Sequence, residues 1–193
     1  MDWEQKFKED YAPWERGSLH PAVSDWGAQG VFKAGLQILV PGCGRSPEVA
    51  HFARLGLNVT ALDLSATAIA WQREQLAKQG LSATLVEGDG LQWQGSGSLD
   101  LFYEQTFLCA ISPKLRQTYE KRAHDWLKPD GRLLALFMQK DELGGPPYGC
   151  SLDAMQSLFT ADRWAWPGDE NFTPYPHPSL NGKPELGGIL VRR

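Results

Sequence analysis

The chain has 193 residues, a formal net charge of −4 and three cysteines. This length is typical of one domain with a well-buried core, and an acidic chain without a basic tract argues against a nucleic-acid partner. No apolar run has membrane-spanning length, the N-terminus lacks the apolar core of a signal peptide, and the cysteines lack metal-ligand spacing, so we expect a cytoplasmic protein with no metal centre and no membrane contact.

The segment before the first predicted strand is rich in aromatic residues. Trp3, Phe7 and Tyr11 recur every four residues and predict one face of a helix. A second short helix is predicted over 21–32. These side chains would close one end of the core, but their position beside the glycine turn described next also favours a lid, formed by residues 1–33, over a bound cofactor.

The stretch 36–63 carries the strongest functional pattern. An apolar strand over 38–40 leads into a turn that contains Gly42 and Gly44, and a helix and a second strand follow, ending on Asp63. This order is typical of nucleoside-binding sheets: the glycines allow close approach to the backbone, the helix N-terminus offers free N–H groups, and the acid accepts from ribose hydroxyls. A turn that only connects strand to helix is the alternative, and the acid at the second strand's end disfavours it.

Pro47 occupies the place of the third small residue in the dinucleotide fingerprint. Its ring disfavours a pyrophosphate packed tightly on the turn, whereas a carboxylate needs less room. The turn therefore favours an adenosyl amino acid such as S-adenosylmethionine over NAD. Proline in a first helical turn is common, so the helix itself is still expected.

Strands and helices alternate through the rest of the chain. Near-continuous apolar strands separated by helices predict an α/β fold, with a mainly parallel sheet and helices on both faces. The proline-rich stretch over 160–185 is expected to be mostly loop around one weak strand, and the last strand after it is expected to be an inserted or antiparallel edge strand. The predicted elements are a helix over 66–78 with Ser65 as N-cap, strands over 81–86 and 99–103, a helix over 113–127, a strand over 132–138, a helix from Ser151 or Leu152, and a strand over 187–191.

The loop after the third predicted strand reads Gly88-Asp89-Gly90. By itself this sequence indicates a turn. In a nucleotide-binding sheet the same loop lies where an adenine would sit, and Asp89 would accept from its exocyclic amine.

Four stretches together resemble a known family. The chain is similar to the class I S-adenosylmethionine-dependent methyltransferases, and more closely to the thiopurine, thiol and halide methyltransferases. The stretches are Pro13–Gly17 with His20–Ala22, Val40–Ser46 running to Leu62-Asp63, Glu104–Ile111 followed by Pro113, Arg116 and Tyr119, and Gly144–Tyr148.

The resemblance implies one domain over 1–193, with the lid over 1–33 and a Rossmann-like core over 34–193. Seven strands are expected, mostly parallel with an antiparallel last strand. The implied activity moves the methyl group of S-adenosylmethionine, which leaves as S-adenosylhomocysteine, to a small soft nucleophile: a thiol or thiopurine, a halide, or a selenium or tellurium species. A monomer with a small-molecule substrate is expected.

The resemblance also assigns site residues. The expected cofactor-binding residues are Gly42 and Gly44 under the methionine end, Asp63 at the ribose, Leu64, Asp89 and Gly90 around the adenine, Trp14 as a covering aromatic, and Glu104 at the cofactor's amino group or the substrate. Arg116 is expected on the substrate side.

Two of these residues, Glu104 and Arg116, would carry the chemistry. Glu104, which stands where the family mostly has Asp, would take the proton of a thiol, while Arg116 would favour the resulting anion; a halide needs no base. The alternative for Arg116 is a salt bridge to Glu120 on its own helix. Cys43 is expected to be a small packed residue rather than a nucleophile.

Other functions stay open from the sequence. One is methyl transfer to a macromolecule, against which the acidic balance weighs. Another is a non-catalytic adenosyl-ligand binder or an NAD-linked enzyme. His20 and His177 are left out of the catalytic set, because histidines in such loops are more typical of the surface.

Overall fold

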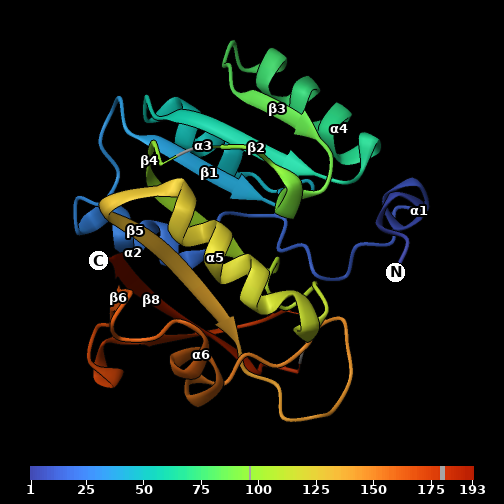
Figure 1. Ribbon diagram of the computed structural model, residues 1–193. Helices are drawn as coiled ribbons and strands as arrows, with labels where there is room; N and C mark the ends of the chain where they lie inside the picture. Colours follow the sequence, from blue (N-terminus) through green and yellow to red (C-terminus); the bar gives the residue numbers. More distant parts are fainter. Residues whose placement is uncertain (96, 179–180) are drawn as a thin grey trace. The chain divides into compact units, whose positions relative to one another are not determined.

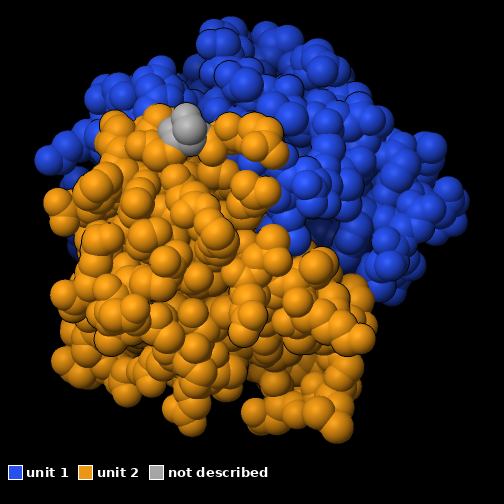
Figure 2. Space-filling view, in the orientation of Figure 1, with its two compact units in different colours: residues 1–93 blue, residues 94–193 orange. Residues whose placement is uncertain are grey.

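A computed structural model of the chain describes residues 1–95, 97–178 and 181–193 (Figure 1). It comprises two units, Met1–Trp93 and Gln94–Arg193, which Figure 2 colours blue and orange. Both units combine strands with helices, so the predicted α/β class is confirmed. The expectation of one domain over 1–193 stays a prediction.

Unit 1 contains three parallel strands, β1 (Gln37–Pro41), β2 (Asn58–Asp63) and β3 (Thr84–Glu87), with β2 between the other two. The backbone N–H of Cys43 donates to the carbonyl of Leu62 (2.9 Å), and that of Gly88 donates to the carbonyl of Asp63 (2.8 Å). The turn after β1, the end of β2 and the loop after β3 therefore lie together at the C-terminal ends of the parallel strands. Ligands of parallel sheets bind at these ends.

The α-helices of unit 1 begin where the sequence places them, and a 3₁₀ turn that was not predicted as a helix follows β3. They are α1 (Trp3–Lys8), α2 (Pro21–Ala28), α3 (Glu48–Arg54), α4 (Ala66–Lys78) and the 3₁₀ turn η1 (Gly90–Gln92). Ser65 caps α4 as predicted, since its side chain accepts from the N–H of Ala68 (3.1 Å). α3 packs against β2, and α4 packs against β2 and β3.

Unit 2 is a mixed sheet. β4 (Leu99–Gln105) and β5 (Leu127–Met138) are parallel, and β8 (Pro184–Arg192) pairs antiparallel with β5, as predicted for the last strand, but it is an inserted strand and not an edge strand. β6 (Trp164–Ala165) and β7 (Thr173–Pro176) also pair with β8. The described residues thus contain eight strands, one more than expected, because the proline-rich stretch contributes two short strands.

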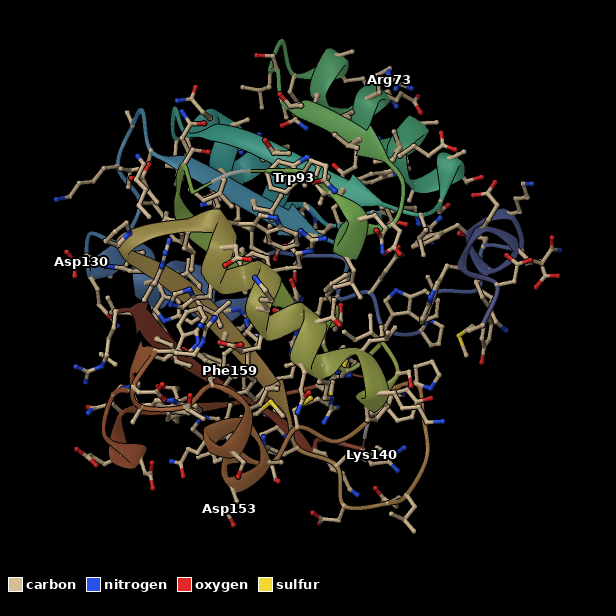
Figure 3. All side chains as sticks on the ribbon, viewed as in Figure 1. Arg73, Trp93, Asp130, Lys140, Asp153 and Phe159 are labelled. Atoms are coloured by element: carbon tan, nitrogen blue, oxygen red, sulfur yellow. The ribbon has the colours of Figure 1, made fainter. Side chains whose placement is uncertain are left out.

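An aromatic core lies between the sheet and the helices of unit 2. These helices are α5 (Arg116–Trp126), α6 (Leu152–Leu158) and the 3₁₀ turns η2 (Pro113–Leu115) and η3 (Asp169–Asn171). Phe159, labelled in Figure 3, is fully buried, and its ring centroid lies 5.4 Å from that of Trp164 and 6.2 Å from that of Tyr119. This packing fixes Tyr119, which reaches the site described below.

Some predicted boundaries were wrong. The second N-terminal helix ends at Ala28, and β3 begins only at Thr84. Residues 128–131, which lie between a predicted helix and a predicted strand, belong instead to β5, where the register shifts and Asp130 has a φ of 64°. Tertiary pairing keeps this Pro-Asp-Gly sequence in the strand as an irregularity, which local propensity does not reveal.

Candidate active site

Asp63 holds the glycine turn of unit 1. Its Oδ2 accepts from the N–H of Gly44 and its Oδ1 from the N–H of Ser65, both at 2.8 Å. Gly42 and Gly44 have φ values of 57° and 46°, in the left-handed region that favours glycine. Burial raises the pKa of the Asp63 carboxyl, and the backbone hydrogen bonds oppose that rise. Each carboxylate oxygen keeps acceptor capacity, so Asp63 suits the two hydroxyls of a ribose.

The residues predicted around an adenine lie at the same edge of unit 1. Leu64 follows Asp63 directly, and its side chain is 56% exposed, so it offers an apolar surface to a flat ring. Asp89 is exposed and accepts from the N–H of Leu91 (2.9 Å) at the start of η1, while Gly90 is buried. The end of β2 and the loop after β3 are therefore adjacent, and the adenine contact predicted for these residues stays a prediction.

The N-terminal segment contacts the glycine turn through aromatic rings. The Phe7 ring is close enough to Gly44 that a Cβ there would lie 3.1 Å from it. Trp14 packs edge-on against Trp3 and Phe7, with ring centroids 5.4 and 5.9 Å apart. Trp14 is partly exposed, and so is available to a ligand.

Charged side chains also attach the N-terminal segment to the glycine turn and to the start of α4. These contacts were not predicted from the sequence. Arg45, in the glycine turn, donates from Nε and Nη2 to the two carboxylate oxygens of Glu15 (2.8 Å each), and from Nη1 to Asp10 (2.5 Å). Glu4 accepts from the hydroxyls of Ser65 (2.5 Å) and Thr67 (2.8 Å). These bonds, with one from the Thr67 N–H, lower the pKa of Glu4 to about 2. The sequence contains one indication of these contacts: Arg45 lies in the glycine turn, and the acids Asp10 and Glu15 precede it in the N-terminal segment.

Glu104, near the end of β4 in unit 2, is 1% exposed. Its Oε1 accepts from the N–H groups of Phe107 (3.1 Å) and Leu108 (2.8 Å), and its Oε2 accepts from the hydroxyl of Tyr119. Burial raises the pKa of Glu104 to about 7, and the nearby Glu185 adds to the rise. The carboxyl can therefore gain or lose a proton near neutral pH, which suits a proton acceptor.

Arg116, at the start of α5, has no carboxylate partner among the described residues. Its Nη2 donates to the carbonyl of Gly149 (2.9 Å) and contacts the Sγ of Cys150 (3.4 Å), and its Nε is buried with no acceptor in the described structure. Burial raises the pKa of Cys150 to about 12, so this thiol is neutral. The hydrogen-bond partners of the guanidinium in the described structure are thus neutral groups.

The alternative partner of Arg116 is engaged elsewhere. Glu120 accepts from the Nε of Arg163 (2.9 Å) and the indole N–H of Trp164 (2.6 Å). The helical salt bridge between Arg116 and Glu120 considered from the sequence is therefore absent.

The remaining candidates are structural. His20 is fully buried and its Nδ1 accepts from the N–H of Ala22 (3.1 Å), and His177 is 3% exposed, so the expectation of surface histidines was wrong. Cys43 is buried with a raised pKa, as expected of a packed residue. No group of metal-ligating side chains occurs among the described residues. Within the same residues, no helix has the length and apolar character needed to cross a membrane.

Comparison with known proteins decides the family. The family model described as thiopurine S-methyltransferase matches residues 1–166. The chain belongs to the thiopurine S-methyltransferase family. Relatives of this methyltransferase include thiocyanate methyltransferase 1 of Arabidopsis thaliana, 30% identical over 96% of this chain and 82% of the relative, and a thiopurine S-methyltransferase of Pseudomonas putida, 23% identical over 76% of each chain.

Solved structures agree on the fold of this methyltransferase. A Burkholderia thailandensis 1,6-didemethyltoxoflavin-N1-methyltransferase, crystallised with S-adenosylhomocysteine, matches with a TM-score of 0.76 at 18% identity, covering 100% of this chain and 85% of that one. TehB from Haemophilus influenzae matches with a TM-score of 0.66 at 19% identity, covering 96% and 65%. The predicted class I fold and the S-adenosylmethionine dependence of the family are confirmed.

The charged contacts of the N-terminal segment predict how fast the product leaves. Arg45→Met keeps much of the apolar stem but removes the bonds to Glu15 and Asp10, so we expect S-adenosylhomocysteine to dissociate about tenfold faster, measured by stopped-flow tryptophan fluorescence. Lys78→Met, which breaks an exposed pair with Glu74 on α4, is the control and leaves the rate unchanged. An unchanged rate in Arg45→Met would show that these contacts do not retain the ligand.

The raised pKa of Glu104 predicts a pH-dependent stability. A carboxyl whose pKa rises from 4.5 to about 7 on folding stabilises the protein most below pH 4.5, and this contribution is lost as the pH rises through 7. Glu104→Gln cannot ionise, so its free energy of unfolding relative to wild type increases by about 2 kcal/mol from pH 5 to pH 8 in urea titrations. Glu170→Gln, at an exposed position, provides the control. If the free energy of unfolding of Glu104→Gln differed from that of wild type by the same amount at pH 5 and pH 8, the raised pKa of Glu104 would be contradicted.

Proposed function

We propose that this methyltransferase transfers the methyl group of S-adenosylmethionine to a small soft nucleophile that binds as an anion: a thiolate, thiocyanate or halide. The single observation that carries the proposal is the guanidinium of Arg116, partly buried and surrounded by neutral partners. A buried positive charge without a counterion is costly, and a bound anion removes that cost. The names of the relatives, which include thiocyanate and thiol methyltransferases, support an acceptor of this class.

Unit 1 supplies the donor-binding residues in this proposal. When bound, S-adenosylmethionine supplies a methyl group activated by a sulfonium. Asp63 accepts from the ribose hydroxyls, and Gly42 and Gly44 let the methionine end approach the backbone. Around the adenine lie Leu64, Asp89 and Gly90, and Trp14 covers the ligand. The fit rests on the buried acid at the glycine turn and on the exposed apolar side chain beside it.

Unit 2 supplies the residues for the acceptor. Displacement at a sulfonium methyl cancels charge rather than creating it, so alignment and exclusion of water supply most of the acceleration. Arg116 holds the attacking anion. A thiol must first lose its proton, and Glu104, with a pKa of about 7, is the proposed group that takes it. Thiocyanate and iodide need no base.

Glu104→Gln separates the roles open to this residue. If Glu104 takes the thiol proton, the variant lowers turnover of 2-mercaptoethanol about a hundredfold but changes turnover of thiocyanate less than about threefold. Gln retains the size of the side chain and one acceptor for the N–H groups of Phe107 and Leu108. Equal losses for both acceptors would mean that Glu104 positions a ligand, such as the amino group of the donor, instead of accepting a proton.

We further propose that the enzyme acts in the cytoplasm, where reduced cysteines are the rule. The support is that Cys43, Cys109 and Cys150 are all buried and unpaired. A monomeric state and the lack of a nucleic-acid partner stay predictions.

An acceptor panel tests the proposed function. The purified chain is incubated with S-adenosylmethionine and separately with thiocyanate, iodide, 2-mercaptoethanol, selenite or tellurite, and methylated products are measured by headspace gas chromatography. We expect methyl thiocyanate, methyl iodide or the methyl thioether at rates that saturate with acceptor concentration. Methyl transfer only to protein or RNA would contradict the proposal.

A further inference from the structure

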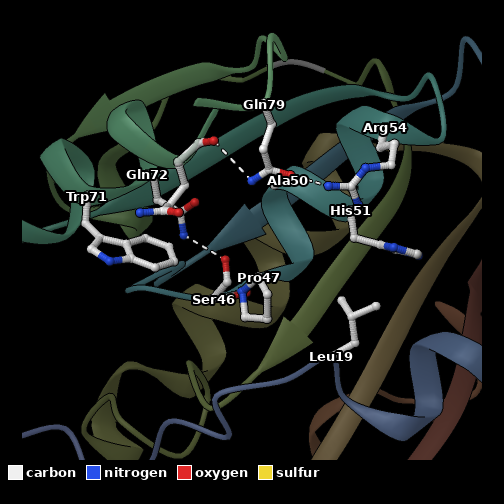
Figure 4. A pocket seen from close by; sticks show the side chains of 10 residues that line it. Leu19, Ser46, Pro47, Ala50, His51, Arg54, Trp71, Gln72 and Gln79 are labelled. Carbon is white, nitrogen blue, oxygen red and sulfur yellow. Dashed lines mark hydrogen bonds between the residues drawn. The ribbon is translucent and has the colours of Figure 1, made fainter. Parts of the chain in front are cut away.

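Unit 1 contains a cavity that none of the proposed donor-binding residues lines. It has a volume of about 170 Å³ and lies between α3 and α4, with Leu19 of the N-terminal segment on another side (Figure 4). A cavity of about 150 Å³ is known to hold one benzene molecule. The space therefore suits a single five- or six-membered ring.

A buried acceptor without a partner lines this cavity. Gln72, on α4, is fully buried, and its Nε2 donates to the backbone carbonyls of Gly44 and Ser46, both at 2.9 Å. Because both carbonyls must face the NH₂ end, the orientation of the amide is fixed and Oε1 faces away from them. No donor in the described structure lies within hydrogen-bond distance of Oε1. An unpaired buried acceptor of this kind indicates a missing donor.

The walls of the cavity define the rest of the ligand. Trp71, partly exposed, provides a flat aromatic face beside Gln72, as Figure 4 shows. Across the cavity from Trp71 in Figure 4 lies Arg54, whose Nη2 donates to the Oε1 of the neutral Gln79, and no carboxylate is among the described residues that line the cavity. Burial, together with the charge of Arg54, lowers the pKa of His51, which is therefore a neutral polar group at pH 7. These walls suit a flat ring with a negative substituent.

We propose that this cavity is a second small-molecule site, for a planar heterocycle that carries an N–H donor and a carboxylate. The ring stacks on Trp71, the carboxylate pairs with Arg54, and the N–H donates to the buried Oε1 of Gln72 after the neighbouring side chains shift to expose that atom. The site is distinct from the donor site, yet Gln72 connects it to the backbone of the glycine turn.

Pyrrole-2-carboxylate is the probe, titrated into the full chain without S-adenosylmethionine and followed by saturation-transfer NMR and calorimetry. Working without the donor separates this proposal from the proposed function. The matched ligand is 1-methylpyrrole-2-carboxylate, which has no N–H. The matched variants are Trp71→Ala, which removes the stacking wall, and Arg73→Ala, an exposed neighbour on α4 that does not line the cavity (labelled in Figure 3).

We expect pyrrole-2-carboxylate to bind saturably with a dissociation constant below about 10 mM. Methylation of its nitrogen weakens binding about tenfold, as does Trp71→Ala, while Arg73→Ala changes it less than about twofold. The comparison of the two ligands uses wild-type protein, so it stands even if Trp71→Ala does not fold. Absence of saturable binding, equal binding of both ligands, or full binding by folded Trp71→Ala would overturn the proposal.

Discussion

Asp63→Ala is expected to raise the dissociation constant of S-adenosylhomocysteine at least about tenfold, because a hydrogen bond to a charged group contributes about 1.5–3 kcal/mol. The effect has two sources. The variant loses the acceptor proposed for the ribose, and it also frees the N–H groups of Gly44 and Ser65, which Asp63 holds at 2.8 Å.

A second variant separates these two sources. Asp63→Asn keeps one acceptor oxygen but turns an NH₂ group toward one of the two backbone N–H groups, so one of those contacts is lost. We expect an intermediate affinity by calorimetry, with a smaller loss of thermal stability than in Asp63→Ala. Glu87→Ala, an exposed acid paired in register with Asp63 on the neighbouring strand, is the control. Unchanged affinity in a folded Asp63→Ala would remove this residue from the donor site.

Arg116→Ala is expected to lower kcat/KM for thiocyanate about thirtyfold or more, chiefly through KM, while the affinity for S-adenosylhomocysteine stays unchanged. The expectation follows from the loss of a charge-assisted contact to the acceptor. Arg116→Lys keeps the charge but not the planar fork that also reaches Gly149, so it recovers only part of the activity.

Lys121→Ala is the control for this series, since Lys121 lies on the same helix in an exposed pair with Asp125. It should leave the steady-state constants unchanged. If Arg116→Ala bound thiocyanate as well as wild type, the guanidinium would have no part in holding the acceptor.

The glycine turn and the helix after β2 were predictable because their signals are local. Gly42 and Gly44 adopt φ values that glycine favours, and Ser65 caps α4 three residues before the N–H that it accepts from. Asp63 follows from the order of strand, turn, helix and strand. In each case the cause lies within a few residues of the effect.

Features that depend on distant segments were not predictable in the same way. Arg45 pairs with Glu15 across 30 positions, and Glu4 reaches the start of α4 across 61, so no periodicity reveals either contact. The partner of Glu120 is Arg163 and not Arg116, which only the packing of unit 2 decides. Helical spacing allows a pair four residues apart but does not exclude a better distant partner.

The burial of Glu104 is another feature that the sequence does not reveal. Its position after an apolar strand was predicted, but its hydrogen bond from Tyr119 and the resulting pKa of about 7 depend on α5 packing over β4. The residue type alone predicts the ordinary pKa of a glutamate, whereas the shift of that pKa depends on the groups around the carboxyl in the folded protein.

An iodide soak shows directly whether Arg116 binds the acceptor anion. Crystals grown with S-adenosylhomocysteine are soaked in sodium iodide, and anomalous diffraction locates the iodide ions. We expect a strong anomalous peak beside the guanidinium of Arg116, which disappears in crystals of Arg116→Ala. Iodide bound only elsewhere, or a peak that persists in the variant, would contradict an anion-binding acceptor site at Arg116.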